Sequence, residues 1–300
     1  MRQTSPELAH TSSAAGPIEI LAALLYCTSS EGSTLSVAQA IGESLPANIE
    51  RAAEIVLRSR YVVALTGAGM SVESGIPPFR GPGGLWTKYG EPPMNGYQRF
   101  LADPAQAWRE RLSPSRPMRE LWETLRTAEP NSGHHALAQL ESAGILRCLI
   151  TQNVDNLHRL AGSQLIEEIH GNYTLIRCIQ CTSRFTREEI RLEALPPHCP
   201  RCDGILKSDT VSFGEPIPTD VLARCFEETE KCDCMLVAGT SATVYPAAQF
   251  PIDVRQQGGQ LIEINPHETE LTAFAAISLR APSAVVLPEL AGRITQLRTA

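Results

Sequence analysis

The stretch VVALTGAGMSVESGIPPFRGPGGLW, residues 62–86, decides how the rest of the chain is interpreted. Residues 61–66 (YVVALT) form a continuous apolar run, which is typical of a parallel strand buried on both faces. The run leads directly into Gly67-Ala68-Gly69, a turn in which backbone amides can approach a phosphate. We therefore predict a strand and a nucleotide-binding turn, followed by a loop that the prolines at 77 and 78 stiffen.

The same stretch argues against a dehydrogenase. A dinucleotide-binding dehydrogenase continues G-x-G-x-x-G into a helix, and an acidic residue about 20 positions later holds the ribose. Here Val72 replaces the third glycine, and no strand ending in Asp or Glu lies near residue 90. The turn indicates a nucleotide without hydride transfer, although Gly-x-Gly alone also occurs in ordinary turns.

Beyond this stretch, strand-like and helix-like runs alternate from Ile49 onward. Such alternation predicts an α/β fold with a doubly wound parallel sheet. Further strands are expected at residues 145–151, 235–238, 260–265 and 284–287. Helices are expected at residues 131–143, 219–230, 247–257 and 288–297.

Three regions depart from this rhythm. Residues 1–47 are rich in Ser, Thr, Ala and Gly, and we expect an N-terminal extension that is helical in part, at residues 18–26 (IEILAALLY). Residues 85–130 carry prolines and aromatics, which favours a helical insertion or a mobile loop. Residues 172–210 contain paired cysteines and predict a small metal-binding module, so that residues 48–300 form one large domain and one smaller domain.

Composition limits the function classes. The formal charge of −7 argues against sequence-independent nucleic-acid binding and suits a basic peptide better. No apolar run approaches the roughly 18 residues of a membrane span, and the early apolar run lacks the flanks of a secretory signal. We expect a cytoplasmic protein that does not bind membranes. Nothing in the sequence indicates its oligomeric state.

Four of the nine cysteines form two C-x-x-C pairs, Cys178/Cys181 and Cys199/Cys202. Four thiolates complete the tetrahedral shell of one zinc ion and leave no position for water or substrate, so a structural Zn²⁺ is expected. An odd cysteine number and this spacing fit a reducing compartment better than a disulfide framework. The alternative is that one pair is coincidental and its thiols are merely buried.

Polar residues follow several of the expected strands. The carboxyl ends of parallel strands form the ligand crevice of such a sheet. The groups placed there are Gln152, Asn153 and Asp155, then Gly239-Thr240-Ser241, and finally Asn265. For residues 152–155, an Asx-type turn that caps a short helix is about as probable.

His170 lies in Ile-His-Gly, directly before the cysteine module. A histidine at a strand end followed by glycine can titrate near neutrality at the mouth of a cleft. A single histidine is nevertheless more often a structural residue.

Taken in order, GAGMSVESGIPPFRG, TQNVDNLH, IHG, the paired cysteines, SFGEPIP, GTSATVYP and LIEIN closely resemble the sirtuin family over roughly residues 48–300. Sirtuins are NAD-dependent protein-lysine deacylases. The resemblance implies a Rossmann-type domain, a smaller zinc-binding domain, and NAD and an acyl-lysine peptide bound between them. It also implies that NAD is a co-substrate: nicotinamide leaves, and the acyl group ends on ADP-ribose.

Residue roles follow from the same resemblance. His170 matches the catalytic base for the ribose 2′-hydroxyl, and Asn153 is the second catalytic residue. Phe79 matches the aromatic that shields the reacting ribose. The expected NAD contacts are Gly67, Ala68, Gly69, Phe79, Arg80, Gln152, Asn153, Asp155, Gly239, Thr240, Ser241 and Asn265. The segment that pairs with the substrate peptide as an added strand contains Val211, Phe213, Gly214 and Glu215; the alternative is a plain strand and turn with one buried aromatic.

Two positions depart from the family pattern. Pro78 replaces the Asp that contacts the nicotinamide carboxamide, which leaves nicotinamide affinity open. The branch that removes succinyl and malonyl groups carries Tyr-x-x-Arg, whereas Arg111 and Pro114 lie at the approximate positions here. Neutral acyl groups are therefore favoured, acetyl first, with Arg111 on a solvated face.

Two alternatives to deacylation stay open. The same ribosyl cation can meet another nucleophile, which gives an ADP-ribosyltransferase or an NAD hydrolase. A non-catalytic NAD- or peptide-binding module is the third hypothesis, and the presence of both His170 and Asn153 weighs against it.

Overall fold

The computed structural model describes residues 44–80 and 83–299. The expected helix at residues 18–26 lies outside the described residues, as does nearly all of the expected extension at 1–47. Among the described helices, none is long and apolar enough to cross a bilayer.

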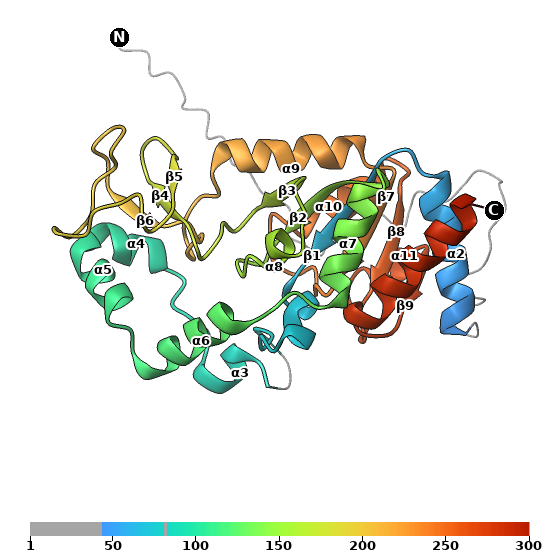
Figure 1. Ribbon diagram of the computed structural model, residues 1–300, viewed down its shortest axis with the longest axis horizontal. Coiled ribbons are helices and arrows are strands. Elements are labelled where there is room, and N and C mark those ends of the chain that lie inside the picture. The colour runs from blue at the N-terminus through green and yellow to red at the C-terminus, as the bar shows by residue number, and fades with distance from the viewer. Residues whose placement is uncertain (1–43, 81–82, 300) are drawn as a thin grey trace, which may run out of the picture. The chain divides into compact units, whose positions relative to one another are not determined.

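A six-stranded parallel sheet forms the centre of the fold (Figure 1). Its strand order is β3-β2-β1-β7-β8-β9. The strands are β1 (Val62–Thr66), β2 (Leu146–Thr151), β3 (Ile166–Glu168), β7 (Cys234–Ala238), β8 (Gln260–Ile264) and β9 (Ile277–Leu279). The chain builds outward from β1 to β3 and then returns to the other side of β1, where the strand order reverses. This is the doubly wound order, and its ligand crevice lies beyond the carboxyl ends of β1 and β7.

Helices cover both faces of the sheet. Because side chains alternate along β1, Val62 and Ala64 enter one core, whereas Val63 and Leu65 enter the other. The first core is completed by α2 (Leu45–Arg58), α7 (Ser132–Ser142) and α11 (Ser283–Thr299). The second is completed by α9 (Thr219–Lys231) and α10 (Gln249–Gln256). Burial on both faces explains the continuous apolar run at residues 61–66.

The strand expected at residues 284–287 is wrong. These residues belong to α11, which begins at Ser283 and contains Pro288 in its interior. Val286, Leu287, Leu290, Ala291 and Ile294 are buried at helical spacing. Val285 and Val286 suggested a strand because the helix was expected to begin at Pro288, which in fact lies inside α11. The edge strands β3 and β9, three residues each, were not predicted.

A smaller domain is built from two separate parts of the chain (Figure 1). Residues 85–127 hold α3 (Leu85–Tyr89), α4 (Gly96–Ala102), α5 (Pro104–Leu112) and α6 (Arg116–Thr127). The cysteine region forms an antiparallel sheet of β4 (Ile176–Cys178), β5 (Arg184–Phe185) and β6 (Leu206–Ser208). Phe100 and Trp108 enter the core of that sheet, and the Trp108 indole N–H donates to Leu206 O at 2.7 Å. The helices α4 and α5 and the cysteine module therefore share one core.

Candidate active site

The loops that follow β1 and β7 pack backbone against backbone. Gly67 N donates to Ala238 O at 3.1 Å, and Gly69 N donates to Gly239 O at 2.7 Å. A Cβ on Gly69 would lie 2.8 Å from Gly239 Cα, and one on Gly239, at φ 63°, would lie 2.3 Å from Met70 N. The glycines are thus required for the two loops to approach each other, and the chain continues into the 3-10 helix η2 (Ala68–Ser74).

The loop after β2 joins these two loops through side chains. Asn153 Nδ2 donates to Gly67 O at 3.0 Å and to Ser71 Oγ at 3.2 Å. Gln152 Nε2 donates to Thr240 Oγ1 at 2.9 Å. The polar residues predicted after β1, β2 and β7 therefore lie together at the carboxyl ends of these strands, where the strand order reverses.

Asp155 takes part in the same cluster and also caps a helix. Ser71 Oγ donates to one carboxylate oxygen at 2.6 Å, and Leu157 N donates to the other at 3.0 Å, which opens α8 (Leu157–Leu160). Burial raises the pKa of Asp155, against the effect of these hydrogen bonds. Asp155 therefore forms the Asx-type turn and also belongs to the polar cluster at the strand ends.

His170 follows β3 and faces the loop after β2. Its Nδ1 lies 3.0 Å from Gln152 O. Because a carbonyl oxygen only accepts hydrogen bonds, Nδ1 carries the proton in this pair and Nε2 holds the lone pair. Burial lowers the pKa of His170, so the neutral imidazole is the form present near neutral pH.

The proline loop carries an exposed aromatic and a cation. Phe79 is 45% exposed and lies 5.3 Å from Trp86, ring centroid to ring centroid. The Arg80 guanidinium lies 4.4 Å from the Trp86 ring centroid, and Arg80 Nη1 donates to Thr243 Oγ1 at 3.3 Å. Trp86 also contacts Phe213 at 5.8 Å. Trp86 was not predicted as a site residue, although it is the last residue of the stretch 62–86.

Residues 211–215 form a turn in this structure. Glu215 N donates to Ser212 O at 3.0 Å, and Gly214 has a φ of 78°. Phe213 O accepts from Tyr97 N at 3.0 Å. The Glu215 carboxylate is buried and forms ion pairs with small-domain side chains, so it anchors the turn from inside.

On the side of β7 away from β1, Asn265 follows β8. Its Nδ2 donates to Thr240 O at 3.1 Å, which fixes the loop after β7. Ser241 is exposed, and its hydroxyl lies 3.0 Å from Thr243 Oγ1.

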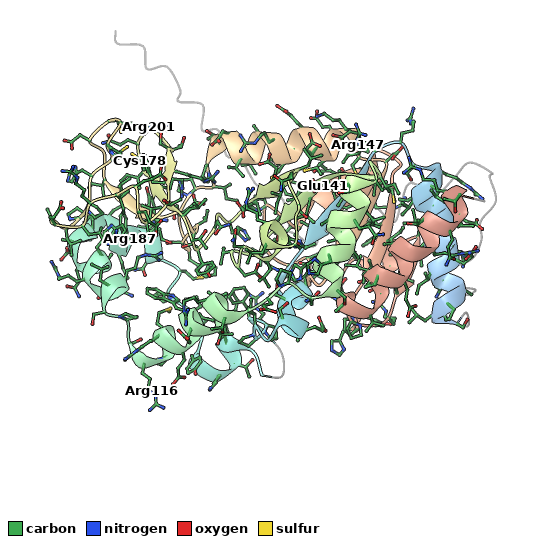
Figure 2. The ribbon with its side chains drawn as sticks, in the orientation of Figure 1. Arg116, Glu141, Arg147, Cys178, Arg187 and Arg201 are labelled. Atoms are coloured by element: carbon green, nitrogen blue, oxygen red, sulfur yellow. The ribbon has the colours of Figure 1, made fainter. Side chains whose placement is uncertain are left out.

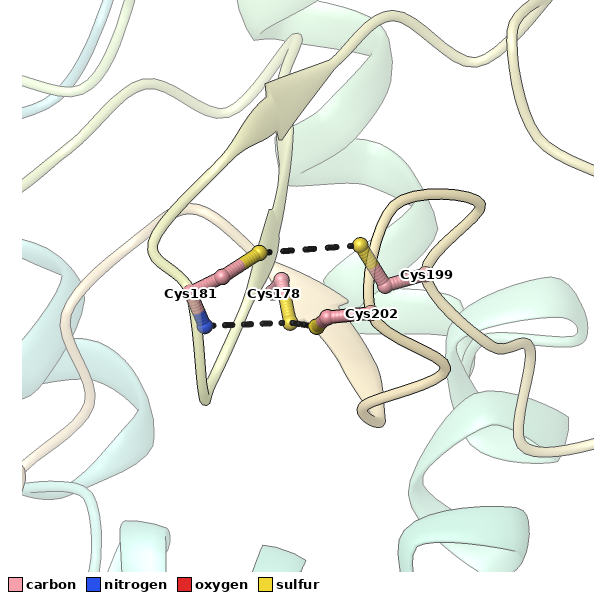
Figure 3. A group of neighbouring side chains, drawn as sticks. All are labelled: Cys178, Cys181, Cys199 and Cys202. Atoms are coloured by element: carbon pink, nitrogen blue, oxygen red, sulfur yellow. Dashed lines mark hydrogen bonds between the residues drawn. The ribbon is translucent and has the colours of Figure 1, made fainter.

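The four predicted zinc ligands converge (Figure 3). The Sγ atoms of Cys178 and Cys202 are 3.5 Å apart, those of Cys181 and Cys199 are 3.7 Å apart, and all four lie within 4.8 Å of one another. A tetrahedral shell with Zn–S bonds of about 2.3 Å places its sulfurs roughly 3.8 Å apart. The geometry therefore fits a closed, structural zinc site.

Arg111 does not lie on a solvated face, and that expectation is wrong. Burial lowers the pKa of its guanidinium, which stacks 5.3 Å from the Trp122 ring centroid and donates to Tyr173 O at 3.3 Å. The end of α5 packs against α6 and the residues after His170, and local sequence carries no signal for such a contact.

Comparisons with known proteins agree with this arrangement. The family model described as "Sir2 family" matches residues 67–246. NAD-dependent protein deacylase 1 of Archaeoglobus fulgidus is 44% identical over 243 residues, which cover 80% of this chain and 96% of that protein. The NAD-dependent protein deacylase of Thermococcus kodakarensis is 41% identical, with 82% and 95% covered.

Solved structures give the same result. A Sir2 homologue mutant in complex with ADP-ribose superposes with a TM-score of 0.71 at 42% identity, covering 83% of this chain and 98% of that one. A Sir2 homologue–NAD complex gives a TM-score of 0.69 at 40% identity, with 90% and 97% covered. A complex described as Sir2, p53 peptide and NAD⁺ gives 0.65 at 31% identity, with 84% and 98% covered.

Proposed function

Because this chain belongs to the Sir2 family, we propose that it is an NAD-dependent protein-lysine deacylase that transfers the acyl group to ADP-ribose and releases nicotinamide. The observation that carries the proposal is His170. Its Nδ1 is held by Gln152 O and its Nε2 keeps the lone pair, and because burial lowers its pKa the ring is neutral near pH 7, so that Nε2 is free to accept a proton.

NAD fits the crevice by the chemistry of its donors and acceptors. Gln152, Thr240 and Asn265 bring amide and hydroxyl groups from three strand ends to the point where the strand order reverses. When bound, NAD supplies the ribose carbon that accepts the acyl oxygen and the nicotinamide that leaves. The proposed contacts are those expected from the sequence: Gly67, Ala68, Gly69, Phe79, Arg80, Gln152, Asn153, Asp155, Gly239, Thr240, Ser241 and Asn265.

Each catalytic side chain has a proposed task. His170 Nε2 accepts the proton of the ribose 2′-hydroxyl. Asn153 is held by Gly67 O and Ser71 Oγ, which fixes its carboxamide against the glycine turn and the start of η2. Phe79 shields the reacting ribose from water, and Trp86 supports Phe79 from the side that faces Phe213.

The proposed protein substrate is an acyl-lysine peptide bound along Val211, Phe213, Gly214 and Glu215. Phe213 presents its ring to Trp86 and so reaches the same aromatic group as Phe79. The negative net charge favours basic peptides.

A structural Zn²⁺ on the four cysteines holds the small domain that carries this segment. Free cysteine thiols throughout the described residues suit a reducing compartment, and we propose the cytoplasm.

The deciding experiment incubates the protein with NAD and an acetyl-lysine peptide and follows nicotinamide and acetyl-ADP-ribose by mass spectrometry. Equal amounts of both products, dependent on peptide, are expected. Nicotinamide released without peptide would favour an NAD hydrolase, and an ADP-ribosylated peptide would favour a transferase. Tight NAD binding without turnover would leave only a binding module.

A matched pair of variants tests the base. His170→Gln lowers deacylation at least about 100-fold, since the amide cannot take up a proton, while NAD still binds. The exposed His135→Gln keeps full activity. A succinyl-lysine peptide assayed in parallel tests the preference for neutral acyl groups.

A further inference from the structure

The turn that carries His170 crosses the segment that leads to the proposed peptide site. Val211 N donates to His170 O at 2.8 Å, and Asn172 N donates to Asp209 Oδ2 at 2.9 Å. Between them, Gly171 has a φ of 76°, and a Cβ there would lie 2.1 Å from Asp209 O. The backbone on both sides of the imidazole is thus held directly against residues 209–211.

Asp209 is the centre of a buried charged cluster. Its side chain is completely buried, and its Oδ1 accepts from Arg177 Nε at 3.1 Å and from Arg184 Nε at 2.9 Å. Arg177 continues to Glu215 at 2.6 Å, and Glu215 pairs with Lys207 at 2.9 Å. The two arginines and the lysine stand on β4, β5 and β6, so Asp209 joins β4 and β5 directly to the His170 turn, and Glu215 adds β6 through Arg177.

The large domain holds the same turn from its other side. Asn172 Nδ2 donates to Glu168 Oε1 at 2.6 Å, and Arg159 pairs with Glu168 at 2.9 Å. Ile169 N donates to Thr151 O at 3.1 Å. The imidazole of His170 has only Gln152 O as a hydrogen-bond partner among the described residues. Its position therefore depends on how its backbone is held.

We infer that Asp209 is a positioning residue for His170. Its carboxylate fixes the Asn172 amide, and through Arg177 and Arg184 it makes the position of the His170 turn depend on the order of the small sheet. It contacts neither substrate nor reacting atoms. The inference rests on the proposed deacylase function, in which His170 is the base, and it adds a residue that the motifs did not single out.

Three variants separate positioning from general stability. Asp209→Asn keeps the shape of the side chain but turns an NH₂ group toward either the arginines or the Asn172 amide, which are donors themselves. Arg184→Gln removes one of the two guanidinium partners, on a side chain that is 31% exposed. Arg187→Gln is the matched control, because Arg187 lies on the same small domain and donates to Ile190 O, outside the cluster (Figure 2).

The kinetic result expected is a loss confined to the step that needs the base. In Asp209→Asn, kcat for acetyl-lysine falls about 100-fold, as for a misplaced catalytic group. The decrease in kcat is smaller in Arg184→Gln, and kcat in Arg187→Gln stays within about twofold of the wild-type value. KM for NAD and exchange of labelled nicotinamide into NAD stay near wild type, because nicotinamide departs before His170 acts. Equal loss of exchange and deacylation would overturn the inference.

An NMR titration of the His170 imidazole, assigned with His170→Gln, reads position without any turnover. A loosened turn hydrates the ring, so its midpoint moves upward toward about 6.5 in Asp209→Asn and Arg184→Gln but not in Arg187→Gln. The inference would be overturned if the midpoint did not move in Asp209→Asn and Arg184→Gln, or if it moved by the same amount in Arg187→Gln. If Asp209→Asn does not fold, Arg184→Gln against Arg187→Gln still decides. Absence of deacylation in the wild type would refute the proposed function alone, because the titration remains valid.

Discussion

Burial acts on titratable residues at the strand ends by favouring their neutral forms. It lowers the pKa of His170 and raises that of Asp155, so one remains a free base while the other binds its proton more readily. The same rule applies to two histidines on α7 and α8. His134 and His158 are fully buried, and their ring centroids lie 4.7 Å apart. Both therefore remain neutral near pH 7.

The histidine pair predicts acid sensitivity. Burial lowers the pKa of His134 to about 4, while an unfolded histidine titrates near 6.5. Between these values the unfolded chain binds more protons, so the free energy of unfolding is full above about pH 6.5 and falls as pH drops toward 4. The loss reaches about 3 kcal/mol for His134, at 1.4 kcal/mol per pH unit, and His158 shifts in the same direction.

Urea unfolding between pH 7.5 and 5 measures this slope. His134→Gln should flatten it, whereas His135→Gln, at the exposed neighbour on α7, should retain most of it, because burial lowers the pKa of His134 more than the charge of His135 does. A wild-type protein whose free energy of unfolding is constant over that range would contradict the prediction.

At the scale of elements, α7 links its own start to the nucleotide-binding turn. Asn131 Oδ1 accepts from Gly133 N at 3.0 Å and forms a capping box with His134. Its Nδ2 donates to Met70 O at 2.9 Å and Ser74 Oγ at 3.0 Å, both in η2. One asparagine therefore caps a helix and holds the loop after β1.

Asn131→Ala should lower the free energy of unfolding by about 2 kcal/mol, the upper end of the cost of losing a helix cap, because the contacts to η2 disappear as well. Asn95→Ala is the control, since Asn95 occupies the same position before α4 but makes no side-chain cap hydrogen bond. Chemical denaturation of both variants measures the difference, and equal losses would show that the cap and the η2 contacts contribute nothing.

Elements with a strong local pattern could be predicted from the sequence. The strands β1, β2, β7 and β8 are apolar runs because neighbours bury both of their faces, and the four cysteines converge because C-x-x-C fixes each pair locally. The polar residues after the strands were also identified, although local pattern could not show that Gln152 and Thr240 hold each other. The Val-Val run of α11 misled because β-branched residues also pack well in a buried helix face.

For the whole molecule, the core of the small domain could not be predicted. Trp108 enters the core around Ile176 and Leu206, about 70 to 100 positions later in the chain, and such a contact leaves no periodicity in either segment. Two further cores lie on the two faces of the large sheet and share no residue with the small-domain core. The small domain therefore depends on its own apolar side chains and on the metal.

Removal of zinc should accordingly act on one domain. Each thiolate pair lies on a different loop of the small sheet (Figure 3), so without the metal these loops lose the link that closes the shared core around Trp108. In a chain with Trp86→Phe and Trp122→Phe, chelation should shift the Trp108 fluorescence to longer wavelength, while most of the far-ultraviolet circular dichroism remains. Added zinc should reverse both changes.

Paired cysteine variants assign this effect to the four ligands. Cys181→Ser should lower the zinc content, measured by mass spectrometry, and reproduce the fluorescence shift, because three thiolates and a weakly binding hydroxyl hold the ion less tightly. Cys148→Ser changes a buried thiol of the large domain and should retain one zinc per chain. Deacylation should fail together with the fluorescence change, since the link from Arg184 to Asp209 and the His170 turn depends on an ordered small sheet. Full activity after complete zinc loss would refute that dependence.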